Sequence, residues 1–192
     1  MSDNAFESIN PATGEIFATT RVWTDEAVEQ ALVQSERQAK LWAQSGFSER
    51  RALLEAVGDQ LESERDRLAG LVTSEMGKLA SEARSEVDKC AWVCRYYAEH
   101  AESFLADENI QTDARRSLVA YQPLGAVLAV MPWNFPLWQV FRFAAPAVAA
   151  GNVGLLKHAS NVMLCSEAIE GIFNRAGAPQ GLFTQLPIKS AK

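Results

Sequence analysis

The sequence has few cysteines, no long apolar run and no amino-terminal leader pattern. Only three of its 192 residues are cysteines, and their positions show neither a metal-binding spacing nor a disulfide framework. No segment reaches the roughly 18 consecutive apolar residues that a membrane span needs. Residues 1–10 lack the basic and then apolar pattern of a secretory signal. We therefore expect reduced thiols, a cytoplasmic protein and no membrane association.

Excess positive charge and internal repetition are also missing. The net charge of −6 and the pI near 5.0 make nucleic acid an unsuitable partner. The chain is 48% hydrophobic and 22% charged, as in a soluble globular enzyme, and no stretch repeats. A Gly-x-Gly-x-x-Gly turn is absent after the first strand of the α/β region. A conventional dinucleotide fingerprint is therefore excluded.

The cysteines themselves fit packing better than chemistry. Cys90 and Cys94 are four positions apart, so both thiols would lie on one helix face and could share a metal ion. Two further ligands would be needed, and the nearby His100 lies on a different face, so no metal site is expected. Cys165 follows Lys157, on the next expected helix. We assign all three to the core, where free cysteine is often buried.

Residues 131–136, MPWNFP, form the most informative segment. Each proline fixes its own φ and favours extended geometry at the residue before it, so Met131 and Phe135 are expected to be extended and a helix to begin only after Phe135. The segment then presents the Asn134 carboxamide as a fixed hydrogen-bond donor. An isolated Asn-Phe-Pro would be an ordinary turn, and only its context favours a functional role.

The amino-terminal half is predicted to be mainly helical. After an extended opening over residues 6–23, Thr24 is a suitable N-cap for a helix to about Gln44. Ser48 is expected to cap a second helix that ends at Gly77, a C-terminal cap. A third helix is expected over residues 79–105, then a loop over residues 107–116 and a strand over residues 117–121 that pairs outside the α/β region that follows.

From Gly125 onward strands and helices alternate. Strands are expected at residues 126–130, 153–156 and 182–187, and helices at residues 137–150 and 162–176. This alternation predicts a parallel sheet covered on both faces. Ligands bind at the carboxyl ends of such strands, where Asn134 and Lys157 both emerge. Pro146 should kink or shorten the first of these helices.

Several motifs together resemble the aldehyde dehydrogenase family. They are residues 9–15 (INPATGE), 75–78 (EMGK), 122–161 with the MPWNFP segment, and 177–181 (GAPQG). The resemblance covers nearly the whole chain and implies an α/β fold with amino-terminal helices and part of a Rossmann-like parallel sheet. Family chains are more than twice as long, and residues 186–192 show no helix cap. We therefore expect a truncation before the catalytic domain.

The resemblance also divides the chain and implies assembly. Residues 1–112 would form the extended segment and helices of the cofactor-binding domain, residues 113–122 a strand of an oligomerisation hairpin, and residues 123–192 the first part of the Rossmann-like sheet. A homo-oligomer is expected for the full-length protein.

The resemblance implies a nicotinamide cofactor, NADP or NAD. The backbone around Pro132, Trp133 and Asn134 would lie along it, and Lys157 would bind the adenosine ribose, with Ser160 beside it. Without the family, Lys157 could equally be a snorkelling lysine at a strand end. A glutamate at the Ser160 position commonly accompanies NAD, so serine makes NADP admissible.

His158 and Ala159 complete the expected cofactor segment between Lys157 and Ser160. His158 stands where the family usually has proline. Two interpretations stay open for its side chain, a contact with a 2′-phosphate or a cover over the end of the strand.

Arg142 favours one class of substrate, an aldehyde that carries a carboxylate at its far end. Enzymes of the branch that oxidises succinate semialdehyde carry an arginine at the matching place, which the resemblance implies holds the distal carboxylate. A guanidinium suits a carboxylate through its two-pronged geometry, and a buried cation needs an anionic partner. The alternative is a structural ion pair with an acidic residue outside this chain.

The expected function is NAD(P)-dependent oxidation of an aldehyde, with succinate semialdehyde as the favoured substrate. Asn134 would hold the oxyanion that forms when a cysteine attacks the aldehyde, and a glutamate would activate water. Both of those partners lie outside this chain. The alternatives are another aldehyde, or a noncatalytic fragment that acts as a folding or oligomerisation unit. The coding sequence beyond Lys192 would discriminate between enzyme and fragment.

Overall fold

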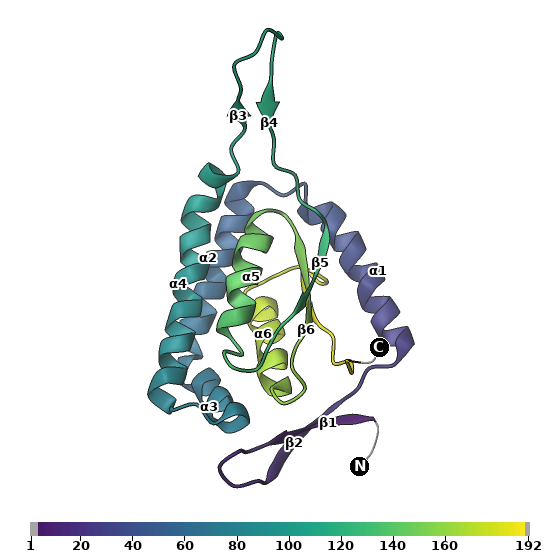
Figure 1. The fold of residues 1–192 in the computed structure, drawn as a ribbon, viewed down its shortest axis with the longest axis vertical. Coiled ribbons are helices and arrows are strands. Elements are labelled where there is room, and N and C mark those ends of the chain that lie inside the picture. The colour runs from purple at the N-terminus through teal and green to yellow at the C-terminus, as the bar shows by residue number, and fades with distance from the viewer. Residues whose placement is uncertain (1–3, 191–192) are drawn as a thin grey trace.

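The computed structural model describes residues 4–190 (Figure 1). The last two residues of the carboxyl-terminal segment, 191 and 192, lie outside the described residues, as do residues 1–3. Along the chain the elements are β1 (Ala5–Ile9), β2 (Ile16–Arg21), α1 (Asp25–Trp42), α2 (Phe47–Ser63), α3 (Arg65–Met76), α4 (Ala80–Phe104), β3 (Glu108–Asn109), β4 (Leu118–Val119), β5 (Ala126–Val130), α5 (Trp138–Ala149), β6 (Val153–Lys157), α6 (Met163–Arg175) and β7 (Phe183–Gln185).

A three-stranded sheet with the order β5-β6-β7 lies at the centre, and both of its pairings are parallel. Helix α1 packs on one face, and α5 and α6 pack on the other, with α2, α3 and α4 outside them (Figure 1). The predicted parallel sheet is therefore confirmed. Coverage of both faces holds for β6, whose residues 153–156 are buried, but Leu128 and Val130 of β5 are 57% and 67% exposed.

Two of the predicted helix caps are confirmed. The Thr24 side chain accepts a hydrogen bond from the Ala27 N–H at the start of α1, which ends at Trp42. Gly77 ends α3 in the left-handed conformation with φ of 76°, which glycine adopts without a steric penalty. The prediction for Ser48 is wrong, because α2 begins at Phe47 and its N-cap is Gly46, which has no side chain to donate or accept.

The single helix expected between Ser48 and Gly77 is two helices. The backbone leaves helical geometry at Glu64, which closes α2 and opens α3 with φ of −101° and ψ of 12°. The Glu64 carboxylate forms ion pairs with Arg67 and, at 2.7 Å, with Arg175 at the end of α6. Periodicity did not reveal the break, because Leu61 and Leu68 are buried on both sides of it.

A kink or a shortening was expected at Pro146, and the shortening is wrong, because helix α5 continues past this residue to Ala149. Proline removes only its own N–H from the helix, and the next turn is intact, since the Ala150 N–H still donates to the Pro146 carbonyl at 3.0 Å.

Two antiparallel hairpins extend from the central body. The first pairs β1 with β2, and the second pairs β3 with β4 and projects from the end of the molecule at which α4 finishes (Figure 1). The strand predicted over residues 117–121 is present as β4, and it pairs outside the central sheet as expected. The segment 107–116 is less irregular than predicted, because it contains β3. Among the described residues, no helix is long and apolar enough to cross a membrane.

Candidate functional site

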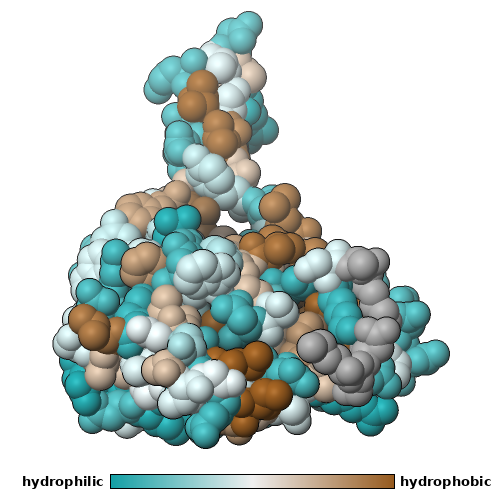
Figure 2. All heavy atoms as spheres, turned by 60° about the horizontal axis from the view of Figure 1, so that its bottom comes forward, coloured by the Kyte–Doolittle hydropathy of each residue, from teal (hydrophilic) through white to brown (hydrophobic). Residues whose placement is uncertain are grey.

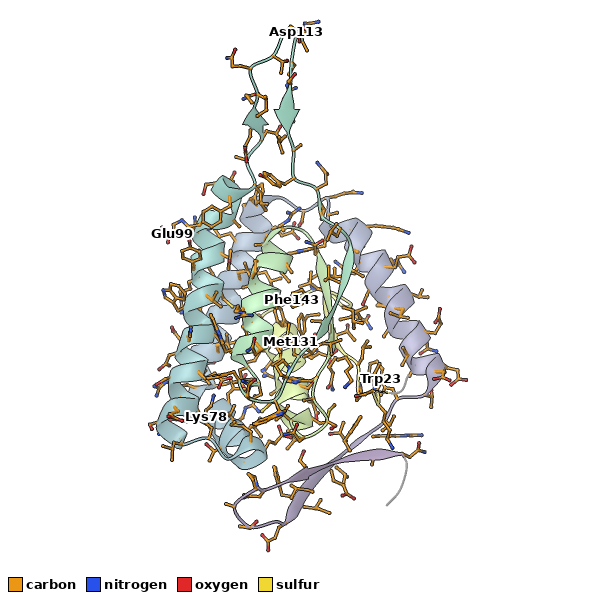
Figure 3. All side chains as sticks on the ribbon, in the orientation of Figure 1. Trp23, Lys78, Glu99, Asp113, Met131 and Phe143 are labelled. Carbon is orange, nitrogen blue, oxygen red and sulfur yellow. The ribbon has the colours of Figure 1, made fainter. Side chains whose placement is uncertain are left out.

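Strands β5 and β6 bring two segments of the chain together at their carboxyl ends. Val130 and Lys157 are register partners, and the Met131 N–H donates to the Lys157 carbonyl at 3.1 Å. The segments that follow, residues 131–136 and 158–161, therefore start side by side. Figure 3 places Met131 well away from Asp113 at the tip of the projecting hairpin. The two segments that carry most of the candidate site residues thus leave the sheet at neighbouring strand ends.

Asn134 lies in an exposed turn on a buried base. Pro132, Trp133, Asn134 and Phe135 are all exposed, whereas Pro136 is buried. Helix α5 begins at Trp138, after the turn, in agreement with the expected effect of the prolines. An exposed carboxamide at a strand end can donate a hydrogen bond to a molecule that binds over the sheet edge.

Lys157 ends β6 with a half-buried side chain. Its ammonium group donates to the Ser190 hydroxyl at 3.1 Å, which links the strand end to the carboxyl-terminal segment. Ser160 is exposed and Ala159 is half-buried in the loop that follows. A cation and a hydroxyl group are therefore present at the same strand end, a donor set that fits a ribose or a phosphate.

His158 is 2% exposed, and both of its ring nitrogens are engaged within the chain. Nδ1 accepts a hydrogen bond from the Ala159 N–H at 2.8 Å, so the proton of the neutral ring resides on Nε2, which donates to the Pro136 carbonyl at 2.8 Å. Burial, the largest cause, lowers the pKa of His158 and favours this neutral form. The geometry favours a cover over the strand end and leaves no ring nitrogen for a 2′-phosphate.

Arg142 is exposed, which corrects the expectation of a buried cation. Phe141 and Ala145 face the core of the molecule, and one residue further along the helix points Arg142 away from that stripe. No hydrogen bond or ion pair joins Arg142 to another residue in the described part of the chain. Its guanidinium group is therefore available to an anion.

The three cysteines are buried in the hydrophobic core, as predicted. Burial raises the pKa of all three thiols, that of Cys94 to about 12. A thiolate is the nucleophilic form of cysteine. None of these residues is therefore suited to attack a carbonyl. Among residues 4–190, no group of three histidine, cysteine or acidic side chains is arranged to hold a metal ion.

Sequence reasoning missed the acidic residues behind the site. Glu75 and Glu86 are both buried, and each accepts backbone N–H groups at the start of a helix, α6 and α5 respectively. A signal was present for Glu86, because it lies four positions before Cys90 and therefore on the helix face of Cys90 and Cys94. The sequence analysis assigned those two cysteines to the core. A charged residue on such a face indicates a specific buried partner.

Comparison with known proteins decides the family. Residues 1–192 match the model of the aldehyde dehydrogenase family. The chain belongs to the aldehyde dehydrogenase family. The resemblance inferred from the sequence motifs is thereby confirmed.

Curated aldehyde dehydrogenases share about half of their residues with the chain over the matched part. A probable succinate-semialdehyde dehydrogenase [NADP(+)] of Synechocystis sp. is 52% identical over 184 residues, which are 96% of this chain and 40% of the relative. Succinate-semialdehyde dehydrogenase [NADP(+)] 1 of Mycobacterium tuberculosis is 48% identical over 186 residues, 95% of this chain and 41% of the relative. The chain thus spans about 40% of the length of these relatives.

Solved structures of aldehyde dehydrogenases show the same fold. The succinic semialdehyde dehydrogenase of Streptococcus pyogenes, in complex with NADP+, superposes with a TM-score of 0.94 at 37% identity. The match covers 97% of this chain and 41% of the Streptococcus chain. The succinate-semialdehyde dehydrogenase of Burkholderia pseudomallei superposes with a TM-score of 0.92 at 29% identity. That match covers 99% of this chain and 40% of the Burkholderia chain. The α/β architecture of the family, expected from the sequence, is confirmed over the matched part.

Proposed function

We propose that the chain supplies the oxyanion donor and the first part of the cofactor and substrate sites of an NADP-dependent succinate-semialdehyde dehydrogenase. The observation that carries the proposal is the exposed Asn134 carboxamide beside the end of β6, on a chain that belongs to the aldehyde dehydrogenase family. The nucleophilic cysteine and the general-base glutamate that the family implies would come from outside these 192 residues.

Asn134 would act on the negative charge that develops at the aldehyde oxygen. Its amide donates a hydrogen bond, and a donor fixed before the reaction stabilises the oxyanion without reorganising during the step. The prolines and the buried base of the turn supply that fixity. The cysteine would form the carbon–sulfur bond, and water would later release the acid.

Lys157 and Ser160 would hold the adenosine end of the cofactor. Pro132, Trp133 and Asn134 would lie along it, and Ala159 would contribute from the segment between Lys157 and Ser160. Serine at position 160 has no carboxylate to repel a 2′-phosphate, which supports NADP, as do the names of the relatives. When bound, the cofactor would accept the hydride.

Arg142 would select the substrate by its distal carboxylate. The guanidinium group is exposed and has no anionic partner in the described part of the chain. Succinate semialdehyde would supply that partner, and the relatives are named for this aldehyde.

Arg142→Leu in a full-length enzyme tests this assignment. A charge-assisted hydrogen bond contributes about 1.5 to 3 kcal/mol, and about 1.4 kcal/mol corresponds to tenfold in rate. We expect kcat/KM for succinate semialdehyde to fall by about one to two orders of magnitude. A neutral aliphatic aldehyde of similar length serves as the control and should be nearly unaffected. Equal losses on both substrates would assign Arg142 to a structural ion pair.

The β3–β4 hairpin would serve assembly in the full-length enzyme. Ile110 and Tyr121, on or beside this hairpin, are exposed, and the hairpin itself projects from the body (Figure 1). We therefore extend the proposal to a homo-oligomer, which sedimentation velocity of the full-length enzyme would detect.

A further inference from the structure

The carboxyl-terminal end of the turn that presents Asn134 is held by two buried side chains, which bind its backbone. His158 Nε2 donates to the Pro136 carbonyl at 2.8 Å. One oxygen of the Glu86 carboxylate accepts the N–H groups of Leu137 and Trp138 at 2.9 and 3.0 Å. These three bonded backbone positions are consecutive and lie two to four residues after Asn134.

Lys78 fixes the other oxygen of the Glu86 carboxylate. The two side chains form an ion pair and are only 8% and 2% exposed. The Lys78 ammonium also lies 3.8 Å from the centroid of the Phe135 ring, the residue next to Asn134. Figure 3 shows Lys78 at the end of α4 that is remote from the projecting hairpin. A buried carboxylate with a cationic partner and two N–H donors has little freedom to move.

The Glu86 and His158 side chains anchor a turn whose own residues are exposed. Because Pro132, Trp133, Asn134 and Phe135 bury little surface, their order must come from the flanking anchors and the proline rings. The Met131 N–H, bonded to the Lys157 carbonyl, is the anchor on the amino-terminal side.

We propose that Glu86, fixed by Lys78, and His158 form a clamp of positioning residues that sets the place of the Asn134 carboxamide. The inference rests on the proposed function of Asn134. It adds that the rate of an aldehyde dehydrogenase built on this chain depends on three side chains that touch neither substrate nor cofactor.

The test combines kinetics with hydrogen exchange in the full-length enzyme. We expect Glu86→Ala and His158→Leu each to lower kcat by about tenfold or more, since a small displacement of a catalytic group has effects of this size. The KM for the cofactor should change less than about threefold. Amide exchange in the peptide that covers residues 131–140 should accelerate in both variants, as measured by mass spectrometry.

Conservative and matched variants separate positioning from general stability. His158→Gln keeps an N–H donor for the Pro136 carbonyl and should retain kcat within about threefold. Glu86→Gln keeps one acceptor oxygen and provides a milder variant if Glu86→Ala does not fold. Glu75→Gln is the matched control, because Glu75 is equally buried and caps α6 through Leu164 and Cys165. It should lower the melting temperature without a comparable loss of kcat.

The outcomes distinguish the clamp from the proposed function. If Asn134→Ala leaves kcat unchanged, the proposed function is wrong, and the exchange measurements alone decide whether the clamp orders the turn. If Asn134→Ala lowers kcat but His158→Leu and Glu86→Ala do not, the clamp is overturned. It is also overturned if Glu75→Gln loses as much kcat as they do, or if exchange in residues 131–140 is unchanged.

Discussion

Asn134 is an exposed polar residue in a turn that becomes buried two residues further along the chain. Trp133 and Phe135 remain exposed with it, while Pro136 and Leu137 enter the core. An oxyanion donor needs this combination, because it must reach the substrate and yet stay in place as charge develops.

Removal of the Asn134 amide should therefore affect the transition state more than cofactor binding. In a full-length enzyme we expect Asn134→Ala to lower kcat by about 10²- to 10³-fold, roughly 3 to 4 kcal/mol. The cofactor dissociation constant, measured by fluorescence titration, should change little. A kcat within a few-fold of the parent would make Asn134 an ordinary turn residue.

His158 should make stability depend on pH in a defined direction. Burial lowers its pKa in the folded protein below the usual value near 6.5, with Lys157 adding to that effect and the Pro136 and Met131 backbone and Glu86 opposing it. The unfolded chain therefore takes up a proton first as the pH falls. The contribution of His158 to the free energy of unfolding should be fully present above about pH 6.5 and should decrease below it, by at most about 1.4 kcal/mol per pH unit.

Glu170 acts in the same pH range with the opposite sign, so the His158 effect must be measured by difference. Burial raises the pKa of Glu170 to about 7, and this contribution to stability is lost as the pH rises toward 7. Urea denaturation at pH 7.5 and 5.5 should show a smaller decrease on acidification for His158→Gln than for the parent. Equal decreases would show that His158 does not titrate as inferred. Glu170→Gln is the control for the opposing group.

The sequence correctly placed Asn134 and Lys157 at the carboxyl ends of two neighbouring strands, because prolines and apolar strands are local signals. It could not give the partner of His158. The bond to the Pro136 carbonyl joins residues 22 positions apart and requires the parallel register of β5 and β6. The exposure of Arg142 was missed for a related reason, since a motif gives a position on a helix and not the cover above it.

At the scale of elements, the buried Arg50 joins the ends of two helices. Its guanidinium group donates to the carbonyls of Ala43 and Ser45, just after α1, and to that of Ala149 at the end of α5, over distances of 2.9 to 3.3 Å. Carbonyls at helix ends have no partner within the helix, and a cation also interacts favourably with the negative end of the helix dipole. Arg50 thus fixes α1 and α5 on opposite faces of the sheet.

Arg50→Met should destabilise the fold substantially. Loss of hydrogen bonds from a charged donor to buried carbonyls should lower the free energy of unfolding by about 3 kcal/mol. For a protein of this size the melting temperature should fall by roughly 6 to 12 °C. Arg51→Met is the control, because Arg51 is exposed and forms an i,i+4 ion pair with Glu55, an interaction that contributes about 0.5 kcal/mol or less. Equal effects in differential scanning calorimetry would contradict the role of Arg50.

Element types were more predictable than element ends. Alternation of apolar strands and helices gave β5 with its observed bounds, and Thr24 and Gly77 marked helix termini because their capping chemistry is local. The break at Glu64 was not predictable. Glu64 pairs with Arg175, 111 positions away, which the local sequence does not reveal, and the apolar spacing runs through the break without interruption.

At the scale of the molecule, the surface is less uniformly polar than the charge content suggests. Figure 2 shows hydrophobic residues on the projecting hairpin and at several places on the body. On the hairpin, Ile110 and Val119 are exposed, and on β5 so are Leu128 and Val130. β6, in contrast, is buried along most of its length. The part of the proposed site that this chain contributes therefore lies beside the most exposed strand of the central sheet.

The chain of 192 residues should not oxidise aldehydes by itself. All three cysteines are buried, and burial raises the pKa of each thiol, so no thiolate is available to attack a carbonyl. A pure sample should form no NADPH from succinate semialdehyde. Its thiols should react slowly with a disulfide reagent in buffer and rapidly in guanidinium chloride.

A variant in which Cys90, Cys94 and Cys165 are all replaced by alanine controls for contaminating enzyme. Activity present in both samples would come from the contaminant. Activity lost only from the variant would show that a buried thiol becomes a nucleophile, contrary to the prediction. Inactivity of both samples, together with activity of a full-length enzyme, would place the nucleophile outside these residues. Asn134 would then be a hydrogen-bond donor in a reaction whose nucleophilic cysteine comes from another part of the protein.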